Sequence, residues 1–272
     1  MKDRIIDLLR KLSSHSSIEL TSRGNTAIFA ALYCARKLQL DKKNVLIPEQ
    51  GGWFTYKKYP KMLGLNPIEI KTDYGVIDVS DLKKQSKNAN CLLYSSPAGY
   101  FAEQPVKEIY SVCKRNKCMV ILDITGSIGA KDHGRFCDFI VCSFGEWKPI
   151  NLGYGGFVSS REKEFFEKPK EIFNTTSFDE KYSKDLINKL ESLKKRYQLF
   201  EKINKKIKKD LKDFEILHPD KDGINVVVRF GNDTEKERII KYCKENNLEF
   251  TLCPRYIRVN ERAVSIEVKR LE

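Results

Sequence analysis

An acid and a lone lysine stand at comparable places after two apolar segments. Asp123 ends the segment 119–123, and Lys148 follows the segment 138–144 and precedes the glycine-rich turn Gly153–Gly156. A lysine held in a dry cleft loses its proton more readily than one in water, so its amine can attack an aldehyde. A carboxylate at the carboxyl end of a core strand lies where open α/β sheets bind ligands. The two residues therefore mark a candidate ligand site at the edge of a sheet.

The wider pattern around these residues resembles the fold-type I enzymes that use pyridoxal 5'-phosphate (PLP). The DegT/DnrJ sugar-aminotransferase branch of that superfamily carries a similar strand-end Asp, a "gDi…SF…K" segment and a following GxGG turn. The corresponding residues here are Val120–Ala130, Gly134–Lys148 and Gly153–Val158. The match covers roughly Ile18 to Ser160, and the combined spacing is more specific than either half alone.

This resemblance implies a role for each of the two residues. It makes Lys148 the amine that forms a Schiff base with PLP and then moves a proton, and it pairs Asp123 with the protonated ring nitrogen. The implied enzyme is a PLP-dependent transferase, most simply an aminotransferase between an amino acid and a keto acid or keto sugar. In the alternative, Asp123 caps the next turn and Lys148 is a surface lysine. The position of 146–149 between two apolar segments favours the catalytic roles.

The cofactor phosphate needs donors at the start of a helix. Gly24, Asn25 and Thr26 lead into the first large helix, and a helix N-terminus is a natural anion site. The resembling family places a small-residue turn at this point and a second phosphate hydroxyl at the position of Ser143. Taken alone, residues 24–26 would be an ordinary N-cap.

An aromatic ring and a hydroxyl are expected beside the pyridine. The family usually stacks an aromatic ring after the strand that here ends at Pro48, which favours Trp53 with Phe54 in reserve. The alternative is a core aromatic at a helix start. In the loop 94–100, the hydroxyl of Ser95 or a backbone group could reach the phenolic oxygen of the cofactor.

One departure from the family leaves the reaction open. Sugar aminotransferases and cysteine desulfurases usually carry Gln where this chain has Gly126, so the contact to the cofactor O3′ must come from Thr125, Ser127 or elsewhere. Cysteine desulfurases also commonly carry His where this chain has Trp147, which argues against a cysteine desulfurase. Two alternatives remain: a PLP-fold enzyme acting on a tRNA-linked amino acid, and a non-catalytic binding or regulatory protein with this fold.

Candidate substrate ligands lie near the C-terminus. Arginine binds a carboxylate through a planar fork, and some aminotransferases carry such an Arg in the small domain, so Arg258 is the first candidate and Arg255 the second. Plain surface arginines are the alternative. His133 is expected to be a solvated turn residue rather than a catalytic one.

The elements that must position these residues alternate between strand and helix over the first 160 residues. This alternation predicts an α/β domain, with a mostly parallel central sheet and helices on both faces. With the resemblance it implies the PLP-dependent transferase (aspartate-aminotransferase-like) fold. The expected helices are 26–40, 56–63, 79–84 and 105–116, and the expected strands are 44–48, 67–71, 91–95, 119–123, 138–144 and 155–159.

From about Arg161 the chain becomes rich in lysine. Apolar residues recur at spacings of three and four from Leu186 to Leu211, which predicts one long helix. Its lysine-rich face could bind nucleic acid, but a solvated face is favoured. A strand (224–230), a helix (234–246) and two strands (250–253 and 263–269) then predict a small α+β domain. We therefore divide the chain into a large PLP-binding domain, 1–160, and a second part, 161–272.

Composition sets the remaining expectations. The eight cysteines include no CxxC pair and lie mostly in apolar segments, which is typical of thiols in a reducing cytoplasm and argues against a zinc site. No apolar segment reaches about 18 residues, so no membrane span is expected. The net charge of +13 permits an anionic partner without proving one. The family resemblance implies small-molecule amino donors and acceptors and a homodimer, because fold-type I active sites usually lie at a dimer interface and little of an N-terminal arm is present.

Overall fold

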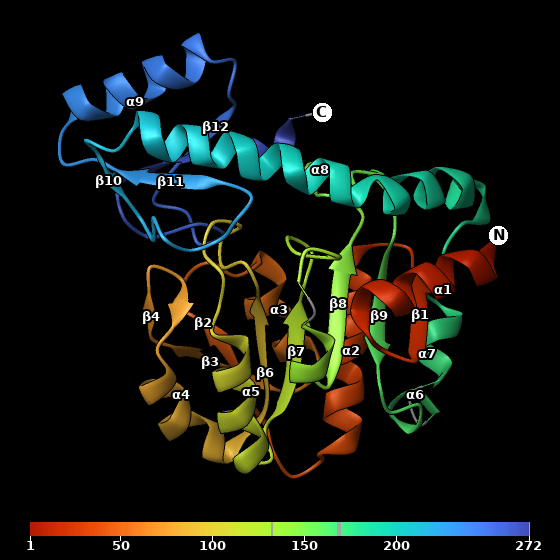
Figure 1. The fold of residues 1–272 in the computed structure, drawn as a ribbon. Coiled ribbons are helices and arrows are strands. Elements are labelled where there is room, and N and C mark those ends of the chain that lie inside the picture. Colours follow the sequence, from red (N-terminus) through yellow and green to blue (C-terminus); the bar gives the residue numbers. More distant parts are fainter. Residues whose placement is uncertain (132, 168–169, 272) are drawn as a thin grey trace.

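The computed structural model describes residues 1–131, 133–167 and 170–271. Figure 1 shows a large sheet flanked by helices, a smaller sheet above it, and one long helix that runs along both. The large unit, which is the large sheet with its flanking helices, holds Asp123 and Lys148, whereas Arg255 and Arg258 lie between two strands of the smaller sheet.

The large sheet has the strand order β1-β9-β8-β7-β6-β2-β3. Strands β3, β2, β6, β7 and β8 run parallel to one another, and β9 runs antiparallel to both β8 and β1. The α/β class with a mostly parallel sheet is therefore confirmed. The strands are β1 (Ser17–Thr21), β2 (Asn44–Pro48), β3 (Asn66–Ile70), β6 (Ala89–Ser95), β7 (Met119–Asp123), β8 (Phe139–Ser143) and β9 (Gly156–Ser160).

Helices cover both faces because alternate strand residues point to opposite sides. On β7, Val120 and Leu122 pack into one core, whereas Met119 and Ile121 pack into the other. Both cores are apolar, so these strands contain continuous hydrophobic segments. The first core takes α1 (Lys2–Ser13), α4 (Val79–Gln85) and α5 (Val106–Arg115), and the second takes α2 (Gly24–Leu38), α3 (Phe54–Met62), α6 (Glu164–Glu167) and α7 (Lys170–Asn174).

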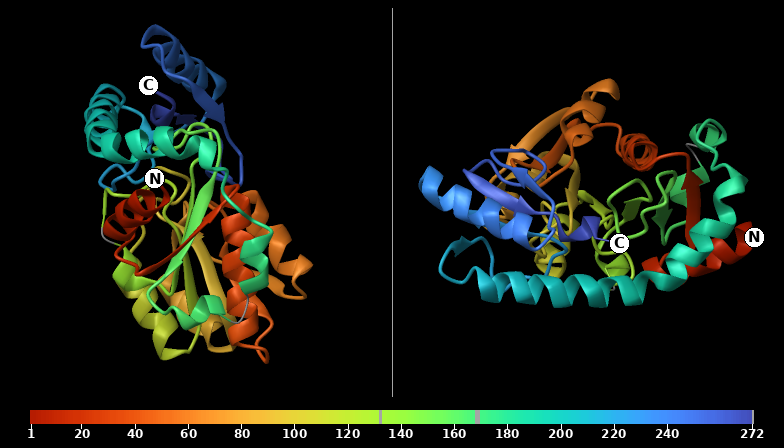
Figure 2. Two further views of the ribbon diagram at one scale, coloured as in Figure 1. Left: turned by 90° about the vertical axis from the view of Figure 1, so that its right-hand side faces the viewer. Right: turned by 90° about the horizontal axis from the view of Figure 1, so that it is seen from above.

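Helix α8 (Ser183–Asp210) contributes to two cores. Leu186 and Leu190 near its start pack into the first core of the large unit, and Phe200 and Ile207 near its end pack into the core of the small one. Figures 1 and 2 show the helix running along both units. The long helix predicted from Leu186 to Leu211 is confirmed as α8. Between Arg161 and its start lie α6, α7 and a 3-10 turn (Glu180–Tyr182). The domain division after Ser160 stays a prediction.

The small unit is an antiparallel sheet with the order β10-β11-β13-β12 and one helix. The predicted strand 263–269 is wrong in its last three residues, because the chain leaves β13 after Ile266 and forms the 3-10 turn Val268–Arg270. Its elements are β10 (Glu215–Ile216), β11 (Val226–Arg229), α9 (Asp233–Glu245), β12 (Phe250–Leu252) and β13 (Ala263–Ile266); a separate two-stranded ribbon is formed by β4 (Thr72–Asp73) and β5 (Val76–Ile77).

Candidate active site

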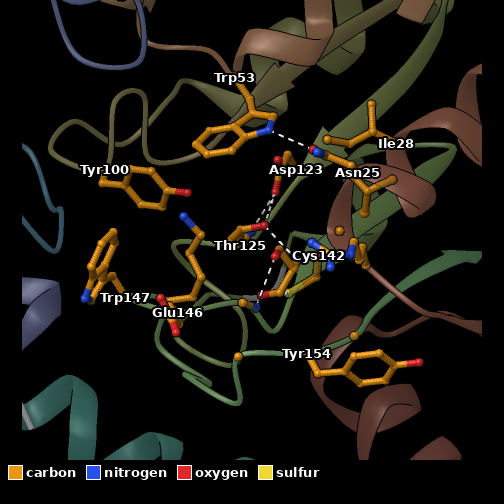
Figure 3. Close-up of a pocket in the computed structure, with 18 residues that line it drawn as sticks. Asn25, Ile28, Trp53, Tyr100, Asp123, Thr125, Cys142, Glu146, Trp147 and Tyr154 are labelled. Carbon is orange, nitrogen blue, oxygen red and sulfur yellow. Dashed lines mark hydrogen bonds between the residues drawn. The ribbon is translucent and has the colours of Figure 1, made fainter. Parts of the chain in front are cut away.

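A cavity of about 290 Å³ lies where β7 and β8 end beside the start of α2. The register places Ser95 beside Asp123 and Asp123 beside Val141, so the carboxyl ends of these parallel strands meet at one edge. Asp123, Lys148 and Trp53 all line the cavity. Figure 3 shows Asp123 and Thr125 on its floor, with the Trp53 and Tyr100 rings along its wall.

Asp123 is a buried carboxylate, only 8% exposed. Its Oδ2 accepts a hydrogen bond of 2.9 Å from the Tyr56 hydroxyl, and its Oδ1 accepts from both the backbone N–H and the hydroxyl of Thr125. Burial raises the pKa of Asp123, and the hydrogen bonds and the nearby Lys148 charge lower it in part, leaving the pKa above its usual value. Since these hydrogen-bond donors are neutral, the carboxylate can still pair with a cationic group of a ligand.

Tyr56 is a site residue that the sequence analysis did not identify. Its side chain is fully buried, and burial together with the Asp123 charge holds the pKa of Tyr56 well above its usual value. The phenol therefore stays neutral and donates to Asp123. One sequence signal pointed to it, since Tyr56 lies three positions after Trp53 at the start of the same helix, where residues share a face.

Lys148 extends into the cavity between two aromatic rings. Its Nζ lies 4.8 Å from the centroid of the Trp53 ring and 5.1 Å from that of Tyr100. The turn that presents it contains Trp147 at a φ of 57°, in the left-handed region, and the Trp147 N–H donates to the Asn151 side chain. Few non-glycine residues adopt this left-handed backbone region, and those that do are concentrated at ligand sites.

The start of α2 approaches β8 closely because Gly24 has no side chain. A Cβ on Gly24 would lie 2.3 Å from the Cβ of Ser143, which is too close for any other residue. Among the residues that the structure describes, no side chain caps this helix. Gly24, Asn25 and Ser143 line the cavity, so its wall includes the first residues of the helix and the positive end of the helix dipole.

Thr125 and Trp53 hold this wall together. The Thr125 hydroxyl accepts from the Ser143 N–H at 3.0 Å, and Trp53 Nε1 donates to Asn25 Oδ1 at 2.8 Å. The structure thus brings Trp53 to the cavity, whereas Phe54 does not line it and is 44% exposed. Thr26 does not line it either. Ser95 also lies outside the lining and donates to the Gly51 carbonyl.

The two candidate substrate arginines lie outside the cavity lining. Arg258 is 3% exposed, and its Nε and Nη2 donate to the Glu267 carboxylate at 2.9 and 2.7 Å. Arg255 is exposed. Because Arg258 uses its fork inside the chain, we do not build the proposed function on either arginine. The expectation that His133 is solvated is wrong, since this residue is buried, with only 7% of its surface exposed.

The cavity wall also contains residues that the sequence analysis did not propose as site residues. Tyr100, Glu146, Trp147 and Tyr154 line it. Trp147 is 49% exposed, and its ring lies 4.5 Å from the Arg270 guanidinium.

The described part of the chain contains no group of three His, Cys, Asp or Glu side chains that could hold a metal ion. Within the same part, no helix is both long enough and apolar enough to cross a membrane.

The fold is that of the PLP-dependent transferases. The chain superposes with a TM-score of 0.78 on 3-amino-5-hydroxybenzoic acid (AHBA) synthase, at 13% identity, covering 99% of this chain and 87% of that one. The same score is found for PseC of Helicobacter pylori, an aminotransferase involved in the biosynthesis of pseudoaminic acid, at 15% identity and 97% and 84% coverage. NtdA from Bacillus subtilis with bound cofactor PMP also scores 0.78, at 14% identity and 98% and 74% coverage.

Sequence comparison reaches less far than the fold. The model of the MJ1341 family C-terminal domain matches residues 191–272, which include the second half of α8 and the small unit. No curated protein matches the chain. The resemblance to fold-type I PLP enzymes predicted from residues 18–160 is confirmed as a likeness of fold.

Proposed function

We propose that this protein is a PLP-dependent aminotransferase, which moves an amino group between an amino acid and a keto acid or keto sugar. One observation carries the proposal: the Lys148 amine and the buried Asp123 carboxylate line a single cavity at the carboxyl edge of the sheet. The neighbours of like fold include PseC, an aminotransferase, and NtdA, which has bound PMP.

The residues present fit PLP. Gly24 lets the start of α2 lie directly against Ser143, where a Cβ would clash. The start of α2, which no side chain of the described residues caps, and the side chains of Asn25 and Ser143 supply donors for the phosphate. The Trp53 face supplies an apolar surface for the ring. Asp123 supplies a carboxylate for the ring nitrogen, and Thr125 orients it through two hydrogen bonds. Thr26 and Ser95 remain candidates of lower rank because neither lines the cavity.

When bound, PLP supplies an aldehyde that condenses with amines and a pyridine ring that withdraws electrons from them. Lys148 would provide the amine that holds the cofactor, and once released it would carry a proton at its Nζ between the substrate carbon and the cofactor carbon on either side of the transferred nitrogen. Asp123 keeps a proton on the ring nitrogen. Trp53 and Tyr100 exclude water from the Lys148 amine, and Tyr56 holds the Asp123 carboxylate in place.

The test is covalent labelling of the lysine. We expect the purified protein with PLP to show a visible absorption band, and borohydride reduction followed by peptide mapping to place the label on Lys148. Lys57→Ala, at an exposed lysine paired with Glu69, serves as the matched control and should keep the band. A label on another lysine, or an absent band, would overturn the proposal.

We further propose that the enzyme works as a homodimer in the cytoplasm. The Trp147 ring in the cavity wall is half exposed, and a second copy could cover it. All eight cysteines are buried thiols, which suits a reducing compartment. Light scattering of the PLP-loaded protein at micromolar concentration tests the assembly. An active species with the mass of one chain would contradict the dimer.

A further inference from the structure

Tyr100 enters the cavity from an unusual backbone conformation. Its φ is 72°, in the left-handed region, within a tight turn in which Ala98 N–H donates to the Ala102 carbonyl at 2.7 Å. Its own carbonyl accepts from the N–H groups of Ile224 and Asn225 at 2.8 and 3.0 Å. Figure 3 shows the ring and its hydroxyl directed into the cavity. The small unit therefore fixes the loop that presents this phenol.

The Tyr100 ring occupies the space beside Gly126. A Cβ built on Gly126 would lie 3.0 Å from Cδ1 of Tyr100 and 3.0 Å from Cδ of Pro97, closer than most real Cβ contacts. A longer side chain at 126 and the ring at 100 therefore compete for one volume. The absence of the family's Gln at position 126 thus has a steric reason, because the volume beside Gly126 is filled by the Tyr100 ring, which carries a phenol hydroxyl.

Positive charges surround the same ring. The Nζ atoms of Lys148 and Lys269 lie 5.1 and 5.2 Å from its centroid, and the Arg258 guanidinium lies 5.0 Å away. Arg258 and Lys269 are themselves held by the buried Glu267 carboxylate, at 2.7 and 3.1 Å. Cations near the electron-rich face stabilise the ring in this position. They also favour negative charge in the cavity near the hydroxyl.

We infer that Tyr100 is a cofactor-binding residue whose hydroxyl donates the hydrogen bond to the phenolic oxygen of PLP that Gly126 cannot make. The cluster of Arg258, Glu267 and Lys269 acts as its positioning group, through the ring. The inference rests on the proposed function, because it concerns the same cavity. Tyr100 then supplies the contact to the cofactor that the family's Gln would make at position 126, and Arg258 has a role in positioning Tyr100.

The first experiment measures the colour of the loaded protein as a function of pH. The hydrogen bond stabilises negative charge on the phenolic oxygen, so Tyr100→Phe should raise the pH midpoint of the visible band by about one unit and weaken PLP binding about tenfold. Tyr154→Phe is the matched control, because Tyr154 lines the cavity but its hydroxyl accepts from the Asp179 N–H at 3.1 Å. It should change neither quantity.

A midpoint in Tyr100→Phe within about 0.2 units of the wild type, a shift about fivefold smaller than the one expected from the lost hydrogen bond, would overturn the inference and leave the proposed function standing. A wild-type protein without a visible band would overturn both.

The second experiment tests the shared volume without cofactor. Gly126→Gln should lower the melting temperature of the cofactor-free chain, because the added side chain meets the Tyr100 ring. Combining it with Tyr100→Ala should recover most of that loss, so the two changes are strongly non-additive. The loaded double variant should also regain the wild-type midpoint of the band. Additive losses in the four-protein cycle would contradict the steric argument.

Discussion

Two buried carboxylates lie in neighbouring parts of this molecule, and their surroundings differ. Asp123 in the cavity is hydrogen-bonded by neutral donors, and burial raises its pKa. At Glu267 in the small unit, burial also acts to raise the pKa, but Arg258 and Lys269 lower it well below the usual range. The negative charge of Glu267 is paired with cations of the same chain, whereas the hydrogen bonds to Asp123 come from neutral donors. We therefore assign Asp123 to ligand binding and Glu267 to the stability of the fold.

The largest effect is expected from the amine that faces Asp123. Lys148→Ala should abolish the visible band and all amino transfer, because among the described lysines it is the one that we place in the cavity wall with Asp123. Absorbance and a coupled assay over a panel of amino acids measure the loss, and Lys57→Ala is the control. Residual transfer above about one thousandth of the wild-type rate would contradict the role.

Asp123→Asn sharpens the comparison, because it should separate activity from stability. We expect PLP to remain bound and amino transfer to slow by roughly a thousandfold or more, since the ring nitrogen loses its anionic partner. The folded pKa of Asp123 is raised, so the ionised carboxylate costs stability at neutral pH. The cofactor-free variant should therefore melt no lower than the wild type at pH 7. Activity within threefold of the wild type, or a large loss of stability, would break the comparison.

Glu267→Gln should have the opposite effect to Asp123→Asn, because it should lower the stability of the fold. Removing the charge leaves Arg258 buried without its counter-ion, which typically costs about 3–5 kcal/mol of unfolding free energy. Urea unfolding of the cofactor-free protein measures this loss. Gln keeps the volume and the hydrogen-bond acceptor, so packing is matched. A loss below about 1 kcal/mol would show that this cluster is not compensated in the way we describe.

The smallest effect on stability is expected from a substitution of Lys269, and this effect should depend on pH. Burial lowers the pKa of Lys269 to about 7, and Glu267, already held by Arg258, restores only part of it. Between about pH 7 and 10.5 the unfolded chain binds a proton at this lysine that the native chain does not, so its contribution to stability rises with pH. Lys269→Met should gain stability relative to the wild type below pH 7, and this gain should shrink as pH rises through that window. A pH-independent difference would contradict the lowered pKa.

The sequence analysis placed most elements of the large unit within a few residues. Buried parallel strands are continuous apolar segments, and helices α2 and α5 show clear periodicity, so both kinds of element are readable locally. It did not assign α1 or β1. Strand β1 is half exposed over its first three residues and pairs with β9, far away in the chain. Such pairing has no local signature.

The site was predictable in part for the same reason. The motif around Asp123 and Lys148 is contiguous within each segment, and the cavity does contain both residues together with Gly24, Asn25, Trp53 and Ser143. Tyr56 and Tyr100 were not assigned, because an aromatic residue at a helix start or in a turn is ordinary in sequence. Arg258 was expected to face the substrate, and its bond to Glu267 could not be foreseen from the residues between them.

The sequence by itself determined most of the strands and helices of the large unit, the α/β class and the pair Asp123 and Lys148, because each depends on residues close together in the chain. Tertiary structure alone decided which groups surround each charge: Tyr56 beside Asp123, Tyr100 above Gly126, and Arg258 on Glu267. The physical reason is that desolvation and pairing depend on contacts between distant segments. The same side chains would titrate and bind differently if those segments met in another way.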